Sequence, residues 1–470
     1  MTNETSLAHH PQGLTIESLD LDAQGIAHKE DGKVVFVEGA LPFEVVTANI
    51  HRKKNNWEQG TLKQLLKTTS QRVSPFCEFF GMHAGACGGC KMQHLNMHSQ
   101  IAVKQRVLED NLWHLGKVKP ELVLRPLQGP DWAYRFRARL SVRYVIKKSK
   151  VLIGFHERKS SYVADMSSCK VLPLHVNQLL APLSDLIFDM DAKDQCPQIE
   201  VACGDQLTAL ILRHLVPLTS SDINMLRTFA ETHKVQWWLQ SKGVDSVVML
   251  DTPAVTTPEN QLFYDLPEFH LRMQFRPTDF TQVNPAINKV LVSKAINLMN
   301  IKPEESVIDW FCGLGNFTLP MARFAHQVTG VEGSQPLLDW ANRNFTLNAS
   351  TVSSFKRPLS AVNFVCKNLF EITPEELLQF SPATKWLIDP PREGAFTLVK
   401  AMADLIQNEN LRGAWEPPKR IVYISCNPAT LARDAGILTH LGAYRCTSTG
   451  MVNMFPHTAH VESMTVFDLN

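Results

Sequence analysis

The carboxyl-terminal third of the chain alternates short apolar runs with longer segments of helical length. Six apolar runs follow residue 300, at 306–310, 327–332, 363–368, 386–391, 420–426 and 463–468. Buried strands of a parallel sheet read as continuous apolar runs, and the connections between such strands are long enough for a helix. We therefore predict a doubly wound, Rossmann-like α/β domain over 271–470, with ligands at the carboxyl ends of its strands.

Four of these predicted strands end in residues that suit a nucleoside ligand. A glycine turn, 313–316, follows the first strand and ends in Asn316; alone it is weak evidence, because the third glycine of a dinucleotide fingerprint is absent. The second strand ends in Glu332, where an acid accepts hydrogen bonds from a ribose diol. Asn368 follows the third strand, and Asp389, stiffened by two prolines, follows the fourth. Together they favour an S-adenosylmethionine site over a nicotinamide site.

The fifth strand ends in a cysteine, Cys426, with Pro428 two residues later. A buried, purely structural role is the more common explanation for a cysteine at the end of a strand. Here, however, the carboxyl ends of the parallel strands meet at one edge of the sheet, so Cys426 is predicted to lie beside the methyl donor. A thiol in that position can serve as a nucleophile.

Five segments of the chain closely resemble the motifs of the RNA uracil-C5 methyltransferases. They are DFTQVNPAIN, DWFCGLGNFTLP, IDPPREGA, YISCNPATLARD and MFPHTAHVESM. Because an amino-terminal β unit and a cysteine cluster accompany them, the chain resembles the 23S ribosomal RNA group of that family over nearly its whole length. The transfer-RNA branch resembles only the catalytic part.

This resemblance implies S-adenosylmethionine as the methyl donor, 23S ribosomal RNA as the partner and 5-methyluridine as the product. It implies that Cys426 is the nucleophile that attacks uracil C6 and that Glu462 is the base that removes the C5 proton. The residues that it assigns to the methyl donor are Gln282, Phe311, Asn316, Glu332, Asn368 and Asp389.

Cys77, Cys87 and Cys90 lie close together in the sequence, and Cys169 follows further along. This spacing fits an iron–sulfur site or a zinc site and does not separate the two. The resemblance favours a 4Fe-4S cluster held by four cysteines. The family usually has five residues between the first two cysteines, whereas nine separate them here, including His83; we expect the longer loop to bulge around an unchanged cluster. The other cysteines are predicted to be buried: Cys196, Cys203, Cys312, Cys366 and Cys446.

Ahead of the Rossmann-like domain we predict two further domains. Residues 13–72 contain β-rich segments separated by turn signals, which favours an OB-like barrel of about five strands; the resemblance identifies it as a TRAM domain. Residues 73–270 form a central α+β domain that carries the four cysteines. Within it, the segment 134–144 alternates apolar residues with arginines, which predicts a strand with an exposed phosphate-binding face. The arginines of that face are Arg135, Arg137, Arg139 and Arg143.

The charge of the chain is strongly asymmetric although its net charge is only +1. Residues 51–150 carry 19 Lys and Arg against 6 Asp and Glu, which favours nucleic acid as a partner. No export signal or membrane segment is visible in the sequence, and ten cysteines are too few for a disulfide scaffold. We therefore expect a cytoplasmic protein with reduced cysteines, no membrane association and no obligate protein partner.

Two alternatives remain. Cytosine-C5 methylation uses the same thiol chemistry, but the comparable RNA enzymes carry a Pro-Cys after the fourth strand, where this chain has Asp-Pro-Pro-Arg. A non-enzymatic iron–sulfur RNA-binding scaffold is the second alternative. The presence of both Cys426 and Glu462 argues against it.

Overall fold

The computed structural model describes residues 13–20, 22–252, 260–350, 357–380 and 382–470. The chain forms two compact units. The first contains the described residues up to Val103, with His156–Tyr162 and His457–Ala459; the second contains Lys104–Phe155, Val163–Pro456 and His460–Asn470. The division into three domains remains a prediction. In the described ranges, no helix has the length and apolar character needed to cross a membrane.

The first unit contains the β-rich region predicted over 13–72. Its six-stranded sheet has the order β1-β5-β6-β4-β3-β2. The strands are β1 (Leu14–Thr15), β2 (Ser18–Leu19), β3 (Gln24–His28), β4 (Val34–Glu38), β5 (Val45–Lys53) and β6 (Trp57–Lys67). Alternating residues bury a small apolar core, which consists of Ile16, Ala27, Val35, Val37, Ala40 and Val46. The sheet is therefore amphipathic, with one face packed and the other available to solvent.

The second unit contains a six-stranded sheet of order β13-β12-β11-β10-β8-β9. Its strands are β8 (Arg137–Val145), β9 (Lys150–Gly154), β10 (Gln198–Cys203), β11 (Thr208–Arg213), β12 (Val235–Gln240) and β13 (Val247–Met249). The alternation predicted for β8 is confirmed along the strand itself. Ala138, Leu140 and Val142 are buried, whereas Arg139 and Arg143 are exposed.

The same unit contains the predicted Rossmann-like sheet, an eight-stranded sheet of order β18-β17-β16-β19-β20-β22-β21-β7. The strands from β18 to β20 are parallel, and β22 runs antiparallel to both of its neighbours. The strands are β7 (Leu122–Val123), β16 (Ser306–Trp310), β17 (Gln327–Glu332), β18 (Ala361–Cys366), β19 (Lys385–Ile388), β20 (Arg420–Ser425), β21 (Tyr444–Val452) and β22 (Glu462–Leu469). The mostly parallel sheet is confirmed, whereas β21 was not predicted.

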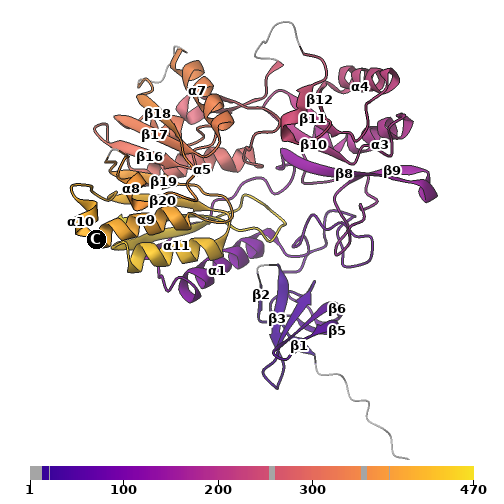
Figure 1. Ribbon diagram of the computed structural model, residues 1–470. Coiled ribbons are helices and arrows are strands. Elements are labelled where there is room, and N and C mark those ends of the chain that lie inside the picture. Colours follow the sequence, from indigo (N-terminus) through magenta and orange to yellow (C-terminus); the bar gives the residue numbers. More distant parts are fainter. Residues whose placement is uncertain (1–12, 21, 253–259, 351–356, 381) are drawn as a thin grey trace, which may run out of the picture. The chain divides into compact units, whose positions relative to one another are not determined.

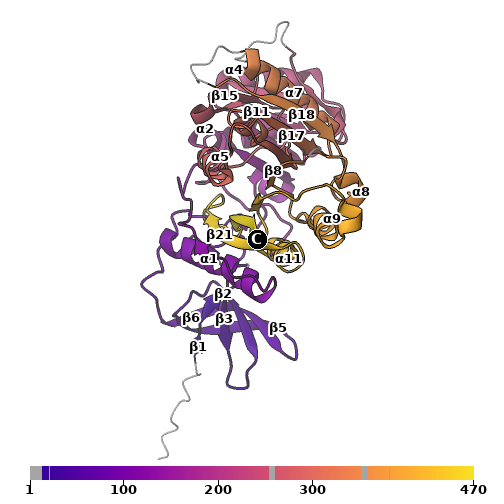
Figure 2. The same ribbon diagram turned by 90° about the vertical axis from the view of Figure 1, so that its left-hand side faces the viewer.

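Helices connect and cover these strands (Figure 1). They are α1 (Met97–His114), α2 (Leu174–Asn177), α3 (Leu180–Asp189), α4 (Ser220–His233), α5 (Pro285–Met299), α6 (Thr318–Met321), α7 (Gln335–Ser350), α8 (Pro374–Leu377), α9 (Phe396–Gln407), α10 (Glu409–Arg412) and α11 (Pro428–His440). A short hairpin, β14 (Phe263–Leu266) and β15 (Leu271–Gln274), precedes α5. Figures 1 and 2 show α9 beside α11, and the two helices pack against each other.

An asparagine cap followed by a proline sets the start of each of the two helices that flank the site described below. Asn284 caps α5 by accepting a hydrogen bond from the Ile287 N–H, and Pro285 occupies the first helical position. Asn427 caps α11 in the same way, accepting from the Ala429 N–H ahead of Pro428. The cap at Asn427 immediately follows Cys426, so both residues between β20 and α11 have defined positions.

Candidate active site

The carboxyl ends of β16, β17, β18, β19 and β20 border a cavity of about 600 Å³ in the second unit. Every residue assigned above to the thiol, the base or the methyl donor lines this one cavity. These residues are Gln282, Phe311, Asn316, Glu332, Asn368, Asp389, Cys426 and Glu462. The fold therefore brings together positions that are up to 180 residues apart in the sequence.

The turn after β16 shapes one side of the cavity. Phe311, Gly313 and Gly315 have positive φ angles of 66°, 52° and 89°. Only glycine adopts such angles without strain, so the two glycines allow the tight turn, and Phe311 is held there by its surroundings. The Gly313 N–H donates to Glu332 Oε2 at 3.2 Å, which fixes that carboxylate at the end of β17. The ring of Phe311 lies 5.8 Å from that of Phe370, giving an aromatic wall.

Asn316 is held from two sides. Its Oδ1 accepts hydrogen bonds from the Tyr264 hydroxyl at 2.9 Å and from Asn288 Nδ2 at 3.0 Å. Its Nδ2 donates to Asn288 Oδ1 at 3.0 Å. A side-chain amide has two donor hydrogens and two acceptor lone pairs. Asn316 therefore keeps one N–H for a ligand and uses the rest to tie the glycine turn to α5.

Burial controls the charge of the reactive groups. It raises the pKa of Asp389 to about 7 and the pKa of Glu462 well above its usual range; the charge of Asp389 adds to the effect on Glu462. Burial also raises the pKa of the Cys426 thiol to about 11, and the charges of Glu462 and Asp389 act in the same direction. The protonated forms of Glu462 and Cys426 are therefore favoured at neutral pH. A cationic ligand would favour the ionised forms.

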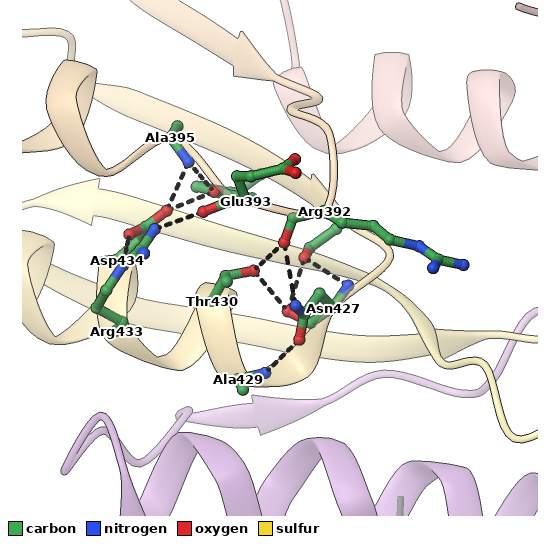
Figure 3. Close-up of polar contacts among 10 residues, drawn as sticks. Arg392, Glu393, Ala395, Asn427, Ala429, Thr430, Arg433 and Asp434 are labelled. Carbon is green, nitrogen blue, oxygen red and sulfur yellow. Dashed lines mark hydrogen bonds and ion pairs between the residues drawn. The ribbon is translucent and has the colours of Figure 1, made fainter. Parts of the chain in front are cut away.

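A polar network holds the loop after β19 against the start of α11 (Figure 3). The carbonyl oxygen of Arg392 accepts hydrogen bonds from Asn427 Nδ2 at 3.0 Å and Thr430 Oγ1 at 3.2 Å. The Ala395 N–H donates to the buried Asp434 carboxylate at 2.8 Å. These contacts fix the loop that begins at Asp389 relative to Cys426. Figure 3 shows the Arg392 side chain extending away from the network.

Several cavity-lining residues were not predicted as part of this site: Arg135, Phe280, Phe370, Arg392, Phe455 and His460. Four of them, Phe280, Arg392, Phe455 and His460, stand inside the family motifs quoted above. Loop residues carry no periodic signal, so proximity to a motif was the one indication available for them.

Two of the four arginines that were predicted to be exposed, Arg135 and Arg137, are partly buried. Arg135 precedes β8 and lines the cavity, and its Nε is buried without a hydrogen-bond partner among the described residues. The Arg137 guanidinium donates to the Pro277 carbonyl at 2.8 Å, and burial lowers its pKa. For Arg135 the physical reason is that β8 begins only at Arg137. The alternation of a strand therefore does not extend to Arg135. Arg137 is part of the strand, and its contact with the Pro277 carbonyl accounts for its burial.

The predicted metal ligands are divided between the two units. Cys77, Cys87 and Cys90 belong to the first unit and Cys169 to the second. The Gly89 N–H donates to Cys87 Sγ at 3.4 Å. Burial, with a smaller contribution from Cys77, raises the pKa of the Cys87 thiol. The Gly89 N–H is compatible with a thiolate at Cys87, whereas the raised pKa favours the thiol. In the described ranges, no three His, Cys, Asp or Glu side chains are gathered to hold an ion.

Of the cysteines predicted to be buried, four are buried and one is not. Cys196, Cys203, Cys312 and Cys446 are buried as expected, whereas Cys366 is exposed. Cys366 ends β18, which is the edge strand of its sheet. It therefore lacks the second neighbouring strand that covers residues in the centre of a sheet.

Comparison with known proteins gives consistent matches along the chain. A family model described as tRNA (Uracil-5-)-methyltransferase matches residues 97–468. The 23S rRNA (uracil(1939)-C(5))-methyltransferase RlmD of Albidiferax ferrireducens is 61% identical over 469 residues, covering 98% of this chain and 97% of that protein. The protein of the same name from Acidovorax sp. is 58% identical, covering 99% and 97%.

A solved structure supports the fold. The Pyrococcus abyssi tRNA (uracil-54, C5)-methyltransferase in complex with S-adenosyl-L-homocysteine matches with a TM-score of 0.68 at 20% identity. The match covers 97% of this chain and 100% of that chain.

Proposed function

The chain belongs to the tRNA (uracil-5-)-methyltransferase family, and from that premise we propose that it methylates C5 of a uridine in 23S ribosomal RNA, using S-adenosylmethionine. The relatives that match nearly the whole chain are named for the uridine at position 1939, and we propose the same target here. The observation that carries the proposal is the single cavity lined by Cys426, Glu462 and all six candidate donor-binding residues.

The chemistry explains why a thiol and a carboxylate are needed together. Uracil C5 is too weak a nucleophile to take a methyl group directly. When Cys426 Sγ bonds to C6, the C5=C6 electron pair moves into an enolate and C5 becomes nucleophilic. C5 then takes the methyl group as the bond between that group and the donor sulfur breaks. Glu462 accepts the C5 proton, the C5=C6 double bond re-forms, and the C6–S bond breaks to release the thiolate. The target base must leave its stack to reach the cavity.

We propose that six residues bind the methyl donor, which when bound supplies an electrophilic methyl group on a sulfonium. Glu332, fixed by the Gly313 N–H, accepts hydrogen bonds from the ribose hydroxyls. Phe311 contributes an aromatic wall for the adenine, and Gln282, Asn316, Asn368 and Asp389 contribute polar contacts around it. The positive sulfonium also lowers the pKa of the nearby acids, so the reactive groups ionise once the donor is present.

The ribosomal RNA partner accounts for the basic residues between 51 and 150. Arg139 and Arg143 are exposed on β8 and are proposed to contact phosphates, together with the amino-terminal β unit, which we propose to be a TRAM domain. Because the substrate is ribosomal RNA, we propose that the protein acts in the cytoplasm, and no obligate protein partner is required.

The direct test of the function is methylation of unmodified 23S ribosomal RNA by the purified protein, followed by mapping of the product. We expect one 5-methyluridine, at position 1939. If 5-methylcytidine forms, the substrate base has been assigned wrongly. The absence of methyl transfer from S-adenosylmethionine to naked ribosomal RNA would favour the RNA-binding scaffold.

We further propose that Cys77, Cys87, Cys90 and Cys169 together hold a 4Fe-4S cluster. With four thiolates bound, every iron is capped, so the cluster has a structural or RNA-folding role. Protein purified without oxygen should contain about four irons per chain with acid-labile sulfide. Cys87→Ser should lower the iron content, whereas Cys366→Ser, at an exposed thiol, and His83→Ala should not. Stoichiometric zinc without sulfide would overturn the assignment.

A further inference from the structure

The first unit contains a second cavity, of about 490 Å³. Its walls come from the rim of the six-stranded sheet, including Leu62 and Thr68, from the segment 72–82, and from His94. None of the cysteines lines it, so it is not the space between the proposed metal ligands. Apolar groups form the larger part of the wall, and the polar side chains that line it are those of Thr68, Arg72, Ser74 and His94. Such cavities bind planar organic groups whose orientation a small number of polar atoms determines.

His94 is the unusual residue of this cavity. Its side chain is 4% exposed, and neither Nδ1 nor Nε2 has a hydrogen-bond partner among the described residues. The ring stacks on Phe80, with centroids 5.5 Å apart and planes at 28°. Burial, followed by the charges of Arg72 and Arg158, lowers the His94 pKa to about 3. The ring is therefore neutral, with one donor and one acceptor nitrogen that both lack a partner.

The charges around the cavity argue against a phosphate inside it. Arg72, which lines the cavity, is already paired: its Nε and one terminal nitrogen contact the Glu44 carboxylate at 2.6 and 2.8 Å. The basic side chains that lack a carboxylate partner among the described residues lie outside the cavity instead. They are exposed on β5, on β6 and on the turn between these strands. They are Arg52, Lys53, Lys54, Lys63 and Lys67. A polyanion would therefore place its charged groups along these exposed basic residues, and an uncharged group of the same molecule would enter the cavity.

An unpaired nucleobase combines the properties that this cavity requires. It is planar and uncharged, and its edge carries both donors and acceptors, so it can pair with one of the two partnerless nitrogens of His94. Phe76, which adjoins the cavity-lining Pro75, is 65% exposed and offers a further surface on which RNA can stack. We propose that this cavity binds one unstacked base of the RNA substrate, with the polar edge of the base paired to His94. The proposal rests on the proposed function, because it takes the same RNA as ligand.

The first test is His94→Leu in the full-length protein. Because the two nitrogens have no partner, their removal should leave the thermal stability of the free protein unchanged or higher. Affinity for a 23S ribosomal RNA fragment should fall about tenfold, the scale of losing one bound base, with the iron content unchanged. His83→Leu is the matched control: His83 is exposed, belongs to the neighbouring loop and does not line the cavity, so affinity should not change.

The second test identifies the base. Nucleotides of the fragment, other than the target, are replaced one at a time by abasic sites, and binding is measured for both proteins. One replacement should weaken binding to the wild type about tenfold and have no further effect on His94→Leu. If every abasic effect persists in the variant, or if His94→Leu binds as tightly as the wild type, the cavity does not bind RNA.

A third variant keeps the proposal testable if His94→Leu does not fold. Ser74→Trp places a bulky ring at an exposed position of the cavity wall without altering His94, and it should abolish the same abasic effect. Unaltered abasic effects in this variant would overturn the proposal. All three tests measure binding rather than turnover, so they can succeed or fail independently of the methylation assay.

Discussion

Cys426→Ala is expected to abolish methyl transfer, lowering the rate by more than about 10⁴-fold, the scale on which loss of an enzyme nucleophile acts. Without a thiolate at C6, uracil C5 does not become nucleophilic, and no other group in the proposed scheme replaces it. Binding of S-adenosylmethionine should survive, because the donor-binding residues come from other strand ends. Transfer of a radiolabelled methyl group measures the first effect, and calorimetric titration with the donor measures the second.

Cys366→Ala provides the matched control. This cysteine also stands at a strand end of the same sheet, but it is exposed and does not line the cavity. Its loss should leave both methyl transfer and donor binding unchanged. Methylation by Cys426→Ala at a rate near that of the wild type would show that the thiol is not the nucleophile.

Much of the candidate site could be predicted because a parallel sheet places its strand ends together. Glu332, Asp389 and Cys426 each follow an apolar run, so recognising the runs was enough to expect these side chains at one edge. All three line the same cavity. The glycine turn was equally visible, since the positive φ angles at Gly313 and Gly315 need the residue type that the sequence shows there.

Features that depend on where an element ends, or on what covers it, could not be predicted. Arg135 and Arg137 belong to one alternating run in the sequence, but the strand begins between them and only the second is part of β8. Cys366 reads as a buried strand residue, and only the strand order shows that β18 is an edge. Phe370 lines the cavity from a loop, where no periodic pattern indicates the direction of a side chain.

Glu462→Gln should give a different failure from Cys426→Ala. The thiolate can still add to C6 and C5 can still take the methyl group, but the C5 proton remains. Without its removal the C6–S bond cannot break, so protein and RNA should stay joined at the methylated base. Loss of a positioned general base lowers a rate by about 10²–10⁴-fold, which allows the adduct to accumulate. A slowly migrating band that depends on the donor should appear on a denaturing gel with Glu462→Gln, and none with Cys426→Ala.

Misfolding should not explain this result, since the buried carboxyl does not stabilise the protein at neutral pH. The pKa of Glu462 is raised in the folded state, so the unfolded state loses this proton first, and stability decreases as the pH rises above about 4.3. A neutral glutamine removes that effect, and the variant should melt at or above the wild-type temperature at pH 8. Glu393→Gln, at an exposed position outside the cavity lining, should turn over normally without a trapped band. Normal turnover by Glu462→Gln would instead make Asp389, a half-buried acid that also lines the cavity, the candidate base.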